Sequence, residues 1–158
     1  MFRIGHSKDV HRLVPDRPLI LGGVTIDHDL GLLGHSDADV LTHVVIEAII
    51  GALGLGDIGS HFPDTDPQYK GANSIDLLIA TKTLLDNSTF KIGNLDATIY
   101  AEQPKMRPHI DAMRANLAQA LDIELSQVNV KATRGEGMGF IGRSEGMGAE
   151  CVVLLVNQ

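Results

Sequence analysis

The chain has 158 residues, of which 44% are hydrophobic and 21% are charged, an ordinary mixture for one globular domain with one core. Its formal net charge is -7 and it has no basic stretch, so we expect no nucleic-acid partner, because binding to nucleic acid requires a basic surface. No apolar run approaches the length of a membrane span, and residues 1–10 lack the pattern of a secretion signal, so we expect no membrane association and a cytoplasmic location. Cys151 is the only cysteine, and its apolar neighbours predict a buried core residue.

Strands and helices are mixed along the chain. The expected elements, in order, are a strand over 2–10, a hairpin with strands over 18–21 and 24–27, a loop over 31–39, a helix over 39–53, an irregular segment over 56–70, a helix over 74–85 capped by Ser74, a strand over 92–100, a helix over 108–121, a strand over 128–133, a glycine-rich loop or bent hairpin over 135–148, and a strand over 150–156. This mixture predicts a single α/β (α+β) domain over residues 1–158, with a mixed sheet packed against helices.

The helix expected over 39–53 is apolar almost all round, so we expect both of its sides to be buried. Gly54 and Gly56 are expected to end it. The candidates for its N-cap are Ser36, Asp37 and Asp39.

The strongest chemical signal is the pair Asp9 and His11. Residues two apart in a strand point to the same face, so these two side chains should project together, with Val10 pointing into the core. The candidates for a third metal ligand are His35, Asp37, Asp39 and His43. Two histidines and one carboxylate form the pattern of a catalytic zinc site, although Asp-x-His is also common without a metal. Four further histidines have no such pairing and are expected to be ordinary surface or hydrogen-bonding residues: His6, His28, His61 and His109.

The glycine-rich segment over 135–148 is a second candidate for binding chemistry. Glycines let a backbone approach phosphate oxygens closely, but the spacing is not that of a Walker A or dinucleotide motif, and a flexible hairpin is the alternative. Glu136 is a candidate for holding magnesium through phosphate. Lys105 is a candidate cation for a diphosphate, and its alternative interpretation is a solvated surface lysine.

Seven segments, in this order, resemble one family over almost the whole chain. They are Arg3 to His6 with Asp9 to His11, Gly34 to Val40 with His43, Gly56 to Gly59, Phe62 to Asp66, Pro104 to Met106, Val128 to Thr133, and Gly139 to Gly146. Together they are similar to the 2-C-methyl-D-erythritol 2,4-cyclodiphosphate synthases of the non-mevalonate isoprenoid pathway.

The resemblance implies a set of roles. The zinc ligands would be Asp9, His11 and His43, the first two also contacting the substrate, and the ligand of magnesium or manganese would be Glu136. The substrate contacts would be His35 and Ser36 for the reacting phosphates, Asp57 and Gly59 for the ribose, and Phe62, Asp64 and Asp66 for the erythritol. The cytidine pocket would be formed by Ala101, Lys105, Met106, Arg107, Ala132 and Thr133. The residues assigned to catalysis are His35, Thr133, Arg134 and Glu136.

The implied activity is that of a phosphorus–oxygen lyase. The 2-phosphate of 4-diphosphocytidyl-2-C-methyl-D-erythritol 2-phosphate would attack the β-phosphorus and CMP would leave, with zinc as a Lewis acid and template. The resemblance also implies a homotrimer whose sites lie between subunits. Phe140 and Arg143 are further substrate-binding candidates, and Arg143 with Glu145 would line the trimer axis, where the family binds an isoprenoid diphosphate. An ion pair between subunits is the alternative for Arg143 and Glu145.

The chain departs from the family pattern at three places. Arg134 stands where the family has a second threonine that contacts the α-phosphate, and an arginine can donate to phosphate with a charge that threonine lacks. Glu102 and Gln103 replace the usual Gln-Ala, from which we expect little effect, and Lys8 stands where many members carry an apolar residue.

Two rival functions remain open on the sequence. A zinc phosphohydrolase would use an activated water and release a linear product. A non-catalytic trimeric ligand-binding protein would keep the site without turnover, which the change at Arg134 allows.

Overall fold

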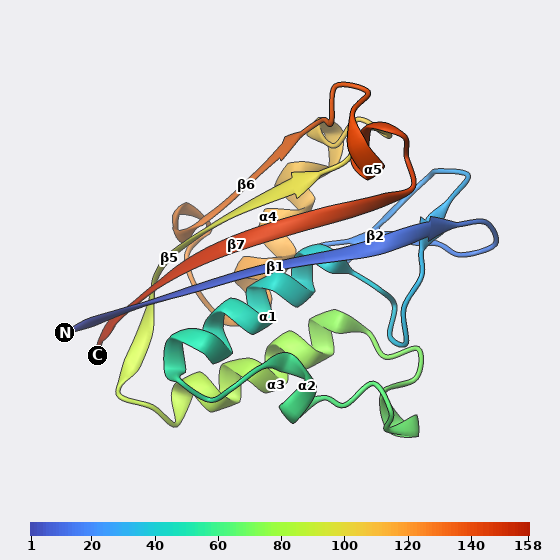
Figure 1. Ribbon diagram of the computed structural model, residues 1–158. Helices are drawn as coiled ribbons and strands as arrows, with labels where there is room; N and C mark the ends of the chain where they lie inside the picture. The colour runs from blue at the N-terminus through green and yellow to red at the C-terminus, as the bar shows by residue number, and fades with distance from the viewer.

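The main sheet is built around a long antiparallel pair of strands (Figure 1). In this computed structural model, which describes residues 1–158, β1 (Phe2–Val14) pairs with β7 (Gly146–Asn157) along almost its whole length. β7 also pairs antiparallel with β5 (Phe90–Tyr100), and β5 pairs parallel with β6 (Val128–Thr133). The short β4 (Gly31–Leu32) completes the order β4-β1-β7-β5-β6, so the sheet is mixed, as predicted.

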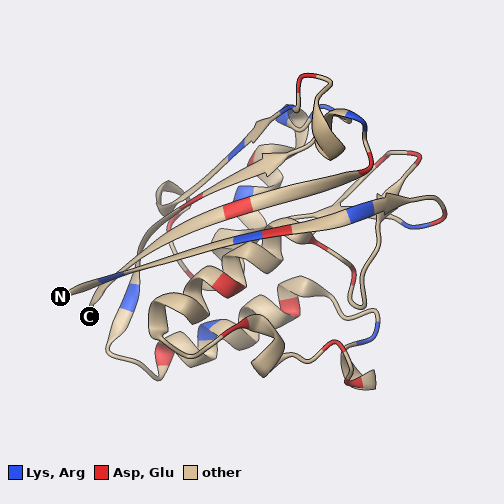
Figure 2. Cartoon of the chain, viewed as in Figure 1, with Lys and Arg blue, Asp and Glu red and all other residues tan.

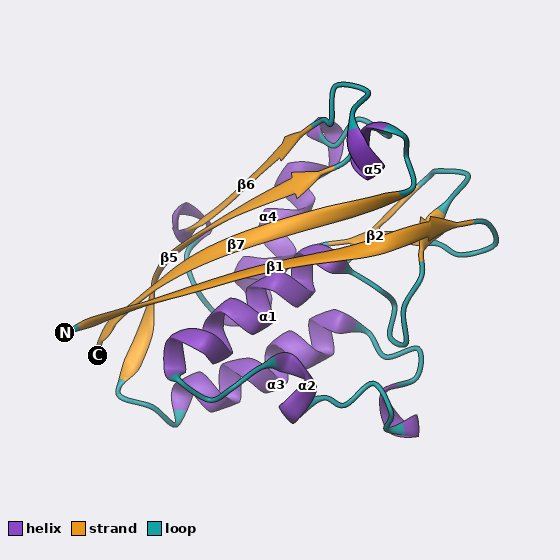
Figure 3. Cartoon of the chain, in the orientation of Figure 1, coloured by secondary structure: helices purple, strands orange, loops and turns teal.

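The longer helices lie together on one side of this sheet (Figure 3). α1 (Val40–Leu53) packs against β1 and β7, α4 (Arg107–Leu121) packs against β6, and α3 (Ser74–Asp86) packs on α1 and α4. The remaining elements are short: the hairpin of β2 (Leu19–Leu21) and β3 (Val24–Ile26), the helices α2 (Ile58–His61) and α5 (Gly139–Gly142), and the 3-10 turns η1 (Pro67–Tyr69) and η2 (Leu125–Gln127). The result is a single α+β domain, and no helix in it combines the length and the apolar character needed to cross a bilayer.

α1 is the centre of the core. Ten of its fourteen residues are buried, because the sheet covers one side and α3 covers the other, as its apolar sequence predicted. Of the three candidate caps, Asp39 is the N-cap: its carboxylate accepts hydrogen bonds from the backbone of Thr42, Gly22 and Gly23. Gly54 ends the helix in the left-handed conformation, with φ of 73°.

One glycine sets the approach of β1 to α1. A Cβ atom at Gly5 would lie 1.8 Å from the carbonyl oxygen of Ala48, so only glycine allows the strand to lie this close to the helix. Ser7, Asp9 and His11 follow on the same face of β1 and reach α1 in turn, Ser7 through a 3.5 Å contact with Glu47. The close packing therefore places two side chains of the candidate metal cluster against the helix.

The prediction that Val10 points into the core is wrong. Its side chain lies on the other face of the sheet and is 47% exposed. Helices cover only one face, and alternation along β1 puts Asp9 and His11 on the covered face and Val10 on the open one. The open face carries four exposed large apolar side chains: Phe2, Ile4, Val10 and Val152.

Several predicted boundaries differ from the structure. α3 is capped by Asn73 and not by Ser74, because the Asn73 carboxamide accepts from the Ile75 backbone while the Ser74 side chain turns elsewhere. β1 continues to Val14, and β7 begins at Gly146, inside the segment predicted as a loop. The segment predicted to be irregular after Gly56 contains α2 and η1. Cys151 is buried as predicted, and burial raises the pKa of its thiol to about 12.

Candidate functional site

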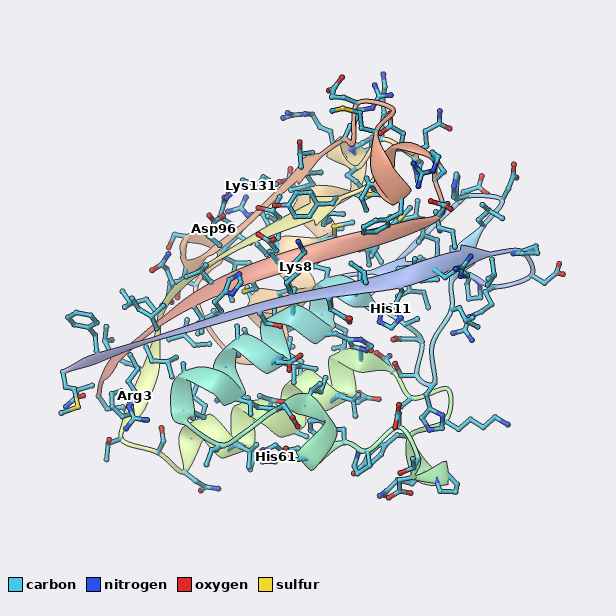
Figure 4. All side chains as sticks on the ribbon, in the orientation of Figure 1. Arg3, Lys8, His11, His61, Asp96 and Lys131 are labelled. Carbon is cyan, nitrogen blue, oxygen red and sulfur yellow. The ribbon has the colours of Figure 1, made fainter.

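Three residues from two elements form the one cluster of metal-ligating side chains. Asp9 and His11 come from β1, and His43 comes from the first turn of α1. One ligand atom from each lies within 4.8 Å of the others. Asp9 Oδ2 is 3.0 Å from His11 Nε2 and 3.6 Å from His43 Nδ1. Figure 4 shows His11 beside the beginning of α1, whereas His61 lies apart from it on α2.

The outer nitrogen of each imidazole is hydrogen-bonded away from the cluster. His11 Nδ1 lies 2.8 Å from the Leu33 carbonyl oxygen, which can only accept, so this nitrogen carries the hydrogen. His11 Nε2 faces the centre, 3.0 Å from Asp9 Oδ2, and can present a lone pair to an ion once it gives up its hydrogen. His43 Nε2 lies 2.9 Å from Ser74 Oγ and 3.1 Å from Ser36 Oγ, which leaves His43 Nδ1 to face Asp9. Both rings are therefore oriented before any ion binds.

The charges of the cluster stabilise one another. Burial acts to raise the pKa of Asp9, but the imidazoles of His11 and His43 outweigh it and hold that pKa well below its ordinary value. Burial acts to lower the pKa of His11, and the Asp9 carboxylate outweighs it and raises the pKa. Two imidazole nitrogens and one carboxylate oxygen are the ligands of catalytic zinc sites, which keep a further position for water or substrate. The donor set fits such an ion.

The other candidates for a third ligand lie outside the cluster and have other partners. Asp37 accepts from the backbone and side chain of Ser74, and Asp39 is the buried cap of α1. His35 Nε2 lies 3.1 Å from the Asp66 carbonyl oxygen. Ser36 stays beside the cluster through its contact with His43.

Arg17 holds the loop that carries His35 and Ser36. Its guanidinium donates to the carbonyl oxygen of Gly34 at 3.2 Å and to that of Ser36 at 3.0 Å, on either side of His35. Sequence reasoning missed this role, because Arg17 lies in an unremarkable turn after β1 and no spacing rule relates it to the loop.

The segment after α1 holds further candidates. Asp57 caps α2 through Ser60. Burial raises the pKa of Glu47 on α1, and the charges of Asp9 and Asp57 raise it further, so Glu47 is within electrostatic reach of both carboxylates. The other candidates in this segment are Gly59 within α2, Phe62 packed edge-on against Tyr69 at 5.7 Å, Asp64 in the following turn, and Asp66 as the cap of η1.

A separate pocket of about 1070 Å³ lies where β5 ends and α4 begins. All six residues expected to form the cytidine pocket line it: Ala101, Lys105, Met106, Arg107, Ala132 and Thr133. Arg134 and Lys131 line it too. With Lys105 and Arg107 the pocket has four basic side chains, although the chain as a whole is acidic. Figure 2 shows several basic positions gathered at this end of the sheet. Such a pocket suits a ligand with phosphate groups.

Glu102 organises one rim of this pocket. Its Oε1 accepts from Arg134 Nη2 at 3.0 Å, and its Oε2 accepts from the Gly135 backbone at 2.8 Å. Burial acts to raise the pKa of Glu102, but the Gly135 N–H and the Arg134 guanidinium outweigh it and lower the pKa. Sequence reasoning missed this contact, because the two residues are thirty-two positions apart.

The remaining candidates lie near α5. Glu136 is exposed, at the left-handed φ of 54°. Phe140 lines a second pocket of about 320 Å³ together with His11. Arg143 Nη2 lies 2.9 Å from Glu145 Oε2, an ion pair within one chain. The larger pocket and the Asp9 cluster have no residue in common, so they are two separate features of one chain.

The YgbB family model matches residues 2–156. The chain belongs to the YgbB family. A relative from Trichlorobacter lovleyi, named 2-C-methyl-D-erythritol 2,4-cyclodiphosphate synthase, is 58% identical over 156 residues, which is 99% of each chain. The family membership predicted from the seven segments is confirmed, and with it the prediction of an enzyme of the phosphorus–oxygen lyase class.

Two solved structures have the same fold. The bifunctional IspDF from Campylobacter jejuni superposes with a TM-score of 0.96 at 43% identity, and the match covers 100% of this chain and 43% of that longer one. IspF from Plasmodium falciparum, solved as a CDP complex, superposes with a TM-score of 0.88 at 32% identity over 99% of this chain and 97% of that one.

Proposed function

We propose that the chain converts 4-diphosphocytidyl-2-C-methyl-D-erythritol 2-phosphate to 2-C-methyl-D-erythritol 2,4-cyclodiphosphate and CMP, and that the reaction depends on zinc. The observation that carries this proposal is the convergence of Asp9, His11 and His43, with Asp9 Oδ2 within 3.0 and 3.6 Å of the two imidazoles. The names of the relatives support the product.

The residues of the chain would bind and orient the substrate. Zinc held by Asp9, His11 and His43 would supply Lewis-acid polarisation of phosphate oxygens. His35 and Ser36, on the loop held by Arg17, would lie beside the reacting phosphates. Orientation of the 2-phosphate toward the β-phosphorus, in a site that excludes water, would favour ring closure over hydrolysis.

The larger pocket would bind the CMP part of the substrate. Its apolar floor, which includes the buried Ala101 and Met106, suits a pyrimidine ring, and the CDP named in a structure of similar fold supports this assignment. Lys105 and Arg134 would neutralise the diphosphate as charge passes to the leaving CMP. Thr133 would donate to the same group, and Glu136 would hold Mg²⁺ or Mn²⁺ against the α- and β-phosphates.

Assembly as a homotrimer would join the two halves of the site. The pocket and the metal cluster are separate in one chain, so a neighbouring chain would bring its pocket to this cluster. The open face of the sheet, with its exposed apolar side chains, would be buried between subunits. Asp57 and Gly59 would contact the ribose, and Phe62, Asp64 and Asp66 the erythritol. We further propose a cytoplasmic location, and an isoprenoid diphosphate on the trimer axis near Arg143 and Glu145. Phe140 would be a further contact of the substrate.

Metal-stripped protein with zinc restored tests this proposal. We expect CMP release to require zinc, and His43→Ala to lose stoichiometric zinc and at least about a hundredfold in turnover, the scale of a lost catalytic interaction. His61→Ala is the matched control, because this partly exposed histidine bonds the Leu55 carbonyl away from the cluster. Stoichiometric zinc and near-normal turnover in His43→Ala would remove the third ligand from the proposed site.

A further inference from the structure

A chain of hydrogen bonds runs outward from His43. Ser74 Oγ, on a wholly buried residue at the beginning of α3, lies 2.9 Å from His43 Nε2. The same hydroxyl donates a short hydrogen bond to Asp37 Oδ1, and the Ser74 backbone N–H donates to Asp37 Oδ2 at 3.0 Å. Asp37 Oδ1 also accepts from the Asp39 backbone at 3.1 Å, so its carboxylate is fixed from two sides.

The direction of these bonds follows from counting hydrogens. A serine hydroxyl has one hydrogen, and an ionised carboxylate can only accept, so the hydrogen of Ser74 points to Asp37. Ser74 Oγ can then only accept from His43 Nε2, so that nitrogen carries the ring hydrogen. A neutral imidazole has one N–H, which leaves the lone pair on His43 Nδ1, the atom facing Asp9.

The two histidines of the cluster are oriented in different ways. His11 depends on the Leu33 backbone carbonyl, which no substitution of a side chain removes. His43 depends on side chains. Ser36 Oγ also lies 3.1 Å from His43 Nε2, and it can accept the same hydrogen, but it receives the Ala38 N–H as well. The buried Ser74, fixed by Asp37, is the closer acceptor.

We propose that Ser74 and Asp37 are positioning residues that hold His43 in its Nε2–H tautomer, and thereby set the affinity of the cluster for zinc. This inference rests on the proposed zinc site. Partners behind a metal-bound histidine fix its tautomer and ring orientation, and losing one typically weakens metal binding by about 10–100-fold.

Two substitutions should release the His43 ring from its Nε2–H tautomer in different ways. In Ser74→Ala the closer acceptor for the Nε2 hydrogen is lost and only Ser36 Oγ at 3.1 Å is left, so the nearby Asp9 carboxylate shifts the balance toward a hydrogen on Nδ1. In Asp37→Ala the Ser74 hydroxyl is released and can donate to His43 Nε2, which also moves the ring hydrogen to Nδ1. Thr81→Ala is the matched control, because this buried hydroxyl on the same helix donates to the Leu77 carbonyl and does not contact His43.

Long-range proton–nitrogen NMR of the metal-free protein at about pH 8, where an ordinary imidazole is neutral, reads the tautomer directly. We expect Nε2–H at His43 in the wild type and in Thr81→Ala, and a shift toward Nδ1–H in both other variants. Competition with a chromophoric chelator should show zinc affinity about 10–100-fold weaker in those two variants alone. Thermal melts identify any variant that fails to fold. If Ser74→Ala or Asp37→Ala does not fold, the other of the two variants tests the inference.

An Nδ1–H tautomer in the wild type would overturn the inference. So would an unchanged tautomer in Ser74→Ala and Asp37→Ala with zinc affinity within about threefold of the wild type, well short of the usual effect. A wild-type protein with the Nε2–H tautomer that binds no zinc would instead refute the proposed zinc site itself.

Discussion

Arg134→Gln separates a role in binding phosphate from a role in holding the fold. The Arg134 side chain is 63% exposed and pairs with Glu102 at 3.0 Å. An exposed ion pair contributes about 0–1 kcal/mol to the free energy of unfolding. In a chain of this length, 1 kcal/mol shifts the melting temperature by about 2–4 °C, so we expect only a small change in stability.

The expected change in activity is larger. A hydrogen bond to a charged group contributes about 1.5–3 kcal/mol. If Arg134 contacts the diphosphate, its loss should lower kcat/KM by about 10–150-fold, since about 1.4 kcal/mol corresponds to a factor of ten. Arg134→Gln is therefore expected to change kcat/KM strongly and the free energy of unfolding only slightly.

The assay is CMP release across substrate concentrations, with a thermal melt of each protein. Lys82→Gln is the control, because it removes another ion pair, with Asp86 at 2.6 Å, outside the pocket, and should leave kcat/KM unchanged. A kcat/KM within about twofold of the wild type would refute a phosphate contact by Arg134, because even a weak hydrogen bond to a charged group is worth more. A large loss of stability with normal kcat/KM would assign the residue to the fold.

Three further results are expected. The pKa of Glu102 is lowered by the Gly135 N–H and the Arg134 guanidinium, so the stability it contributes is present above its ordinary value of 4.5 and is lost as the pH falls through the lowered folded value. The free energy of unfolding of Glu102→Gln, measured at a series of pH values, should approach that of the wild type in acid. A difference that stays constant with pH would contradict this. Gly5→Ala should cost about 1–3 kcal/mol or more in denaturant unfolding, because its Cβ would meet the Ala48 carbonyl oxygen at 1.8 Å, and an unchanged midpoint would show that β1 lies farther from α1. Chelation of a zinc-loaded sample should lower the melting temperature, since an ion at about 100 times its dissociation constant stabilises by about 2.7 kcal/mol, and a melt indifferent to chelator would contradict a native zinc site.

The sequence predicts local structure well where one residue decides it. Gly54 ends α1 as expected, Asp39 caps it as one of the three candidates, and the apolar circumference of that helix predicted its burial on both sides. Val10 shows the limit. The period of two places Val10 opposite Asp9, but it does not tell which face of the sheet the helices cover, and that depends on packing between distant elements.

The residues of the site also differ in how far the sequence predicts them. Asp9 and His11 could be paired from spacing alone, whereas selecting His43 over its neighbours required either the resemblance or the structure. The contacts of Ser74 with Asp37 and of Glu102 with Arg134 could not be predicted, because each joins residues more than thirty positions apart through only one or two hydrogen bonds. No periodic pattern records such contacts.

Phosphorus NMR of the purified protein with 4-diphosphocytidyl-2-C-methyl-D-erythritol 2-phosphate, zinc and magnesium tests the proposed activity most directly. We predict the signals of CMP together with those of a cyclic diphosphate. Unchanged substrate would indicate a non-catalytic ligand-binding protein. CMP with a linear phosphorylated product would contradict intramolecular attack and indicate a zinc phosphohydrolase.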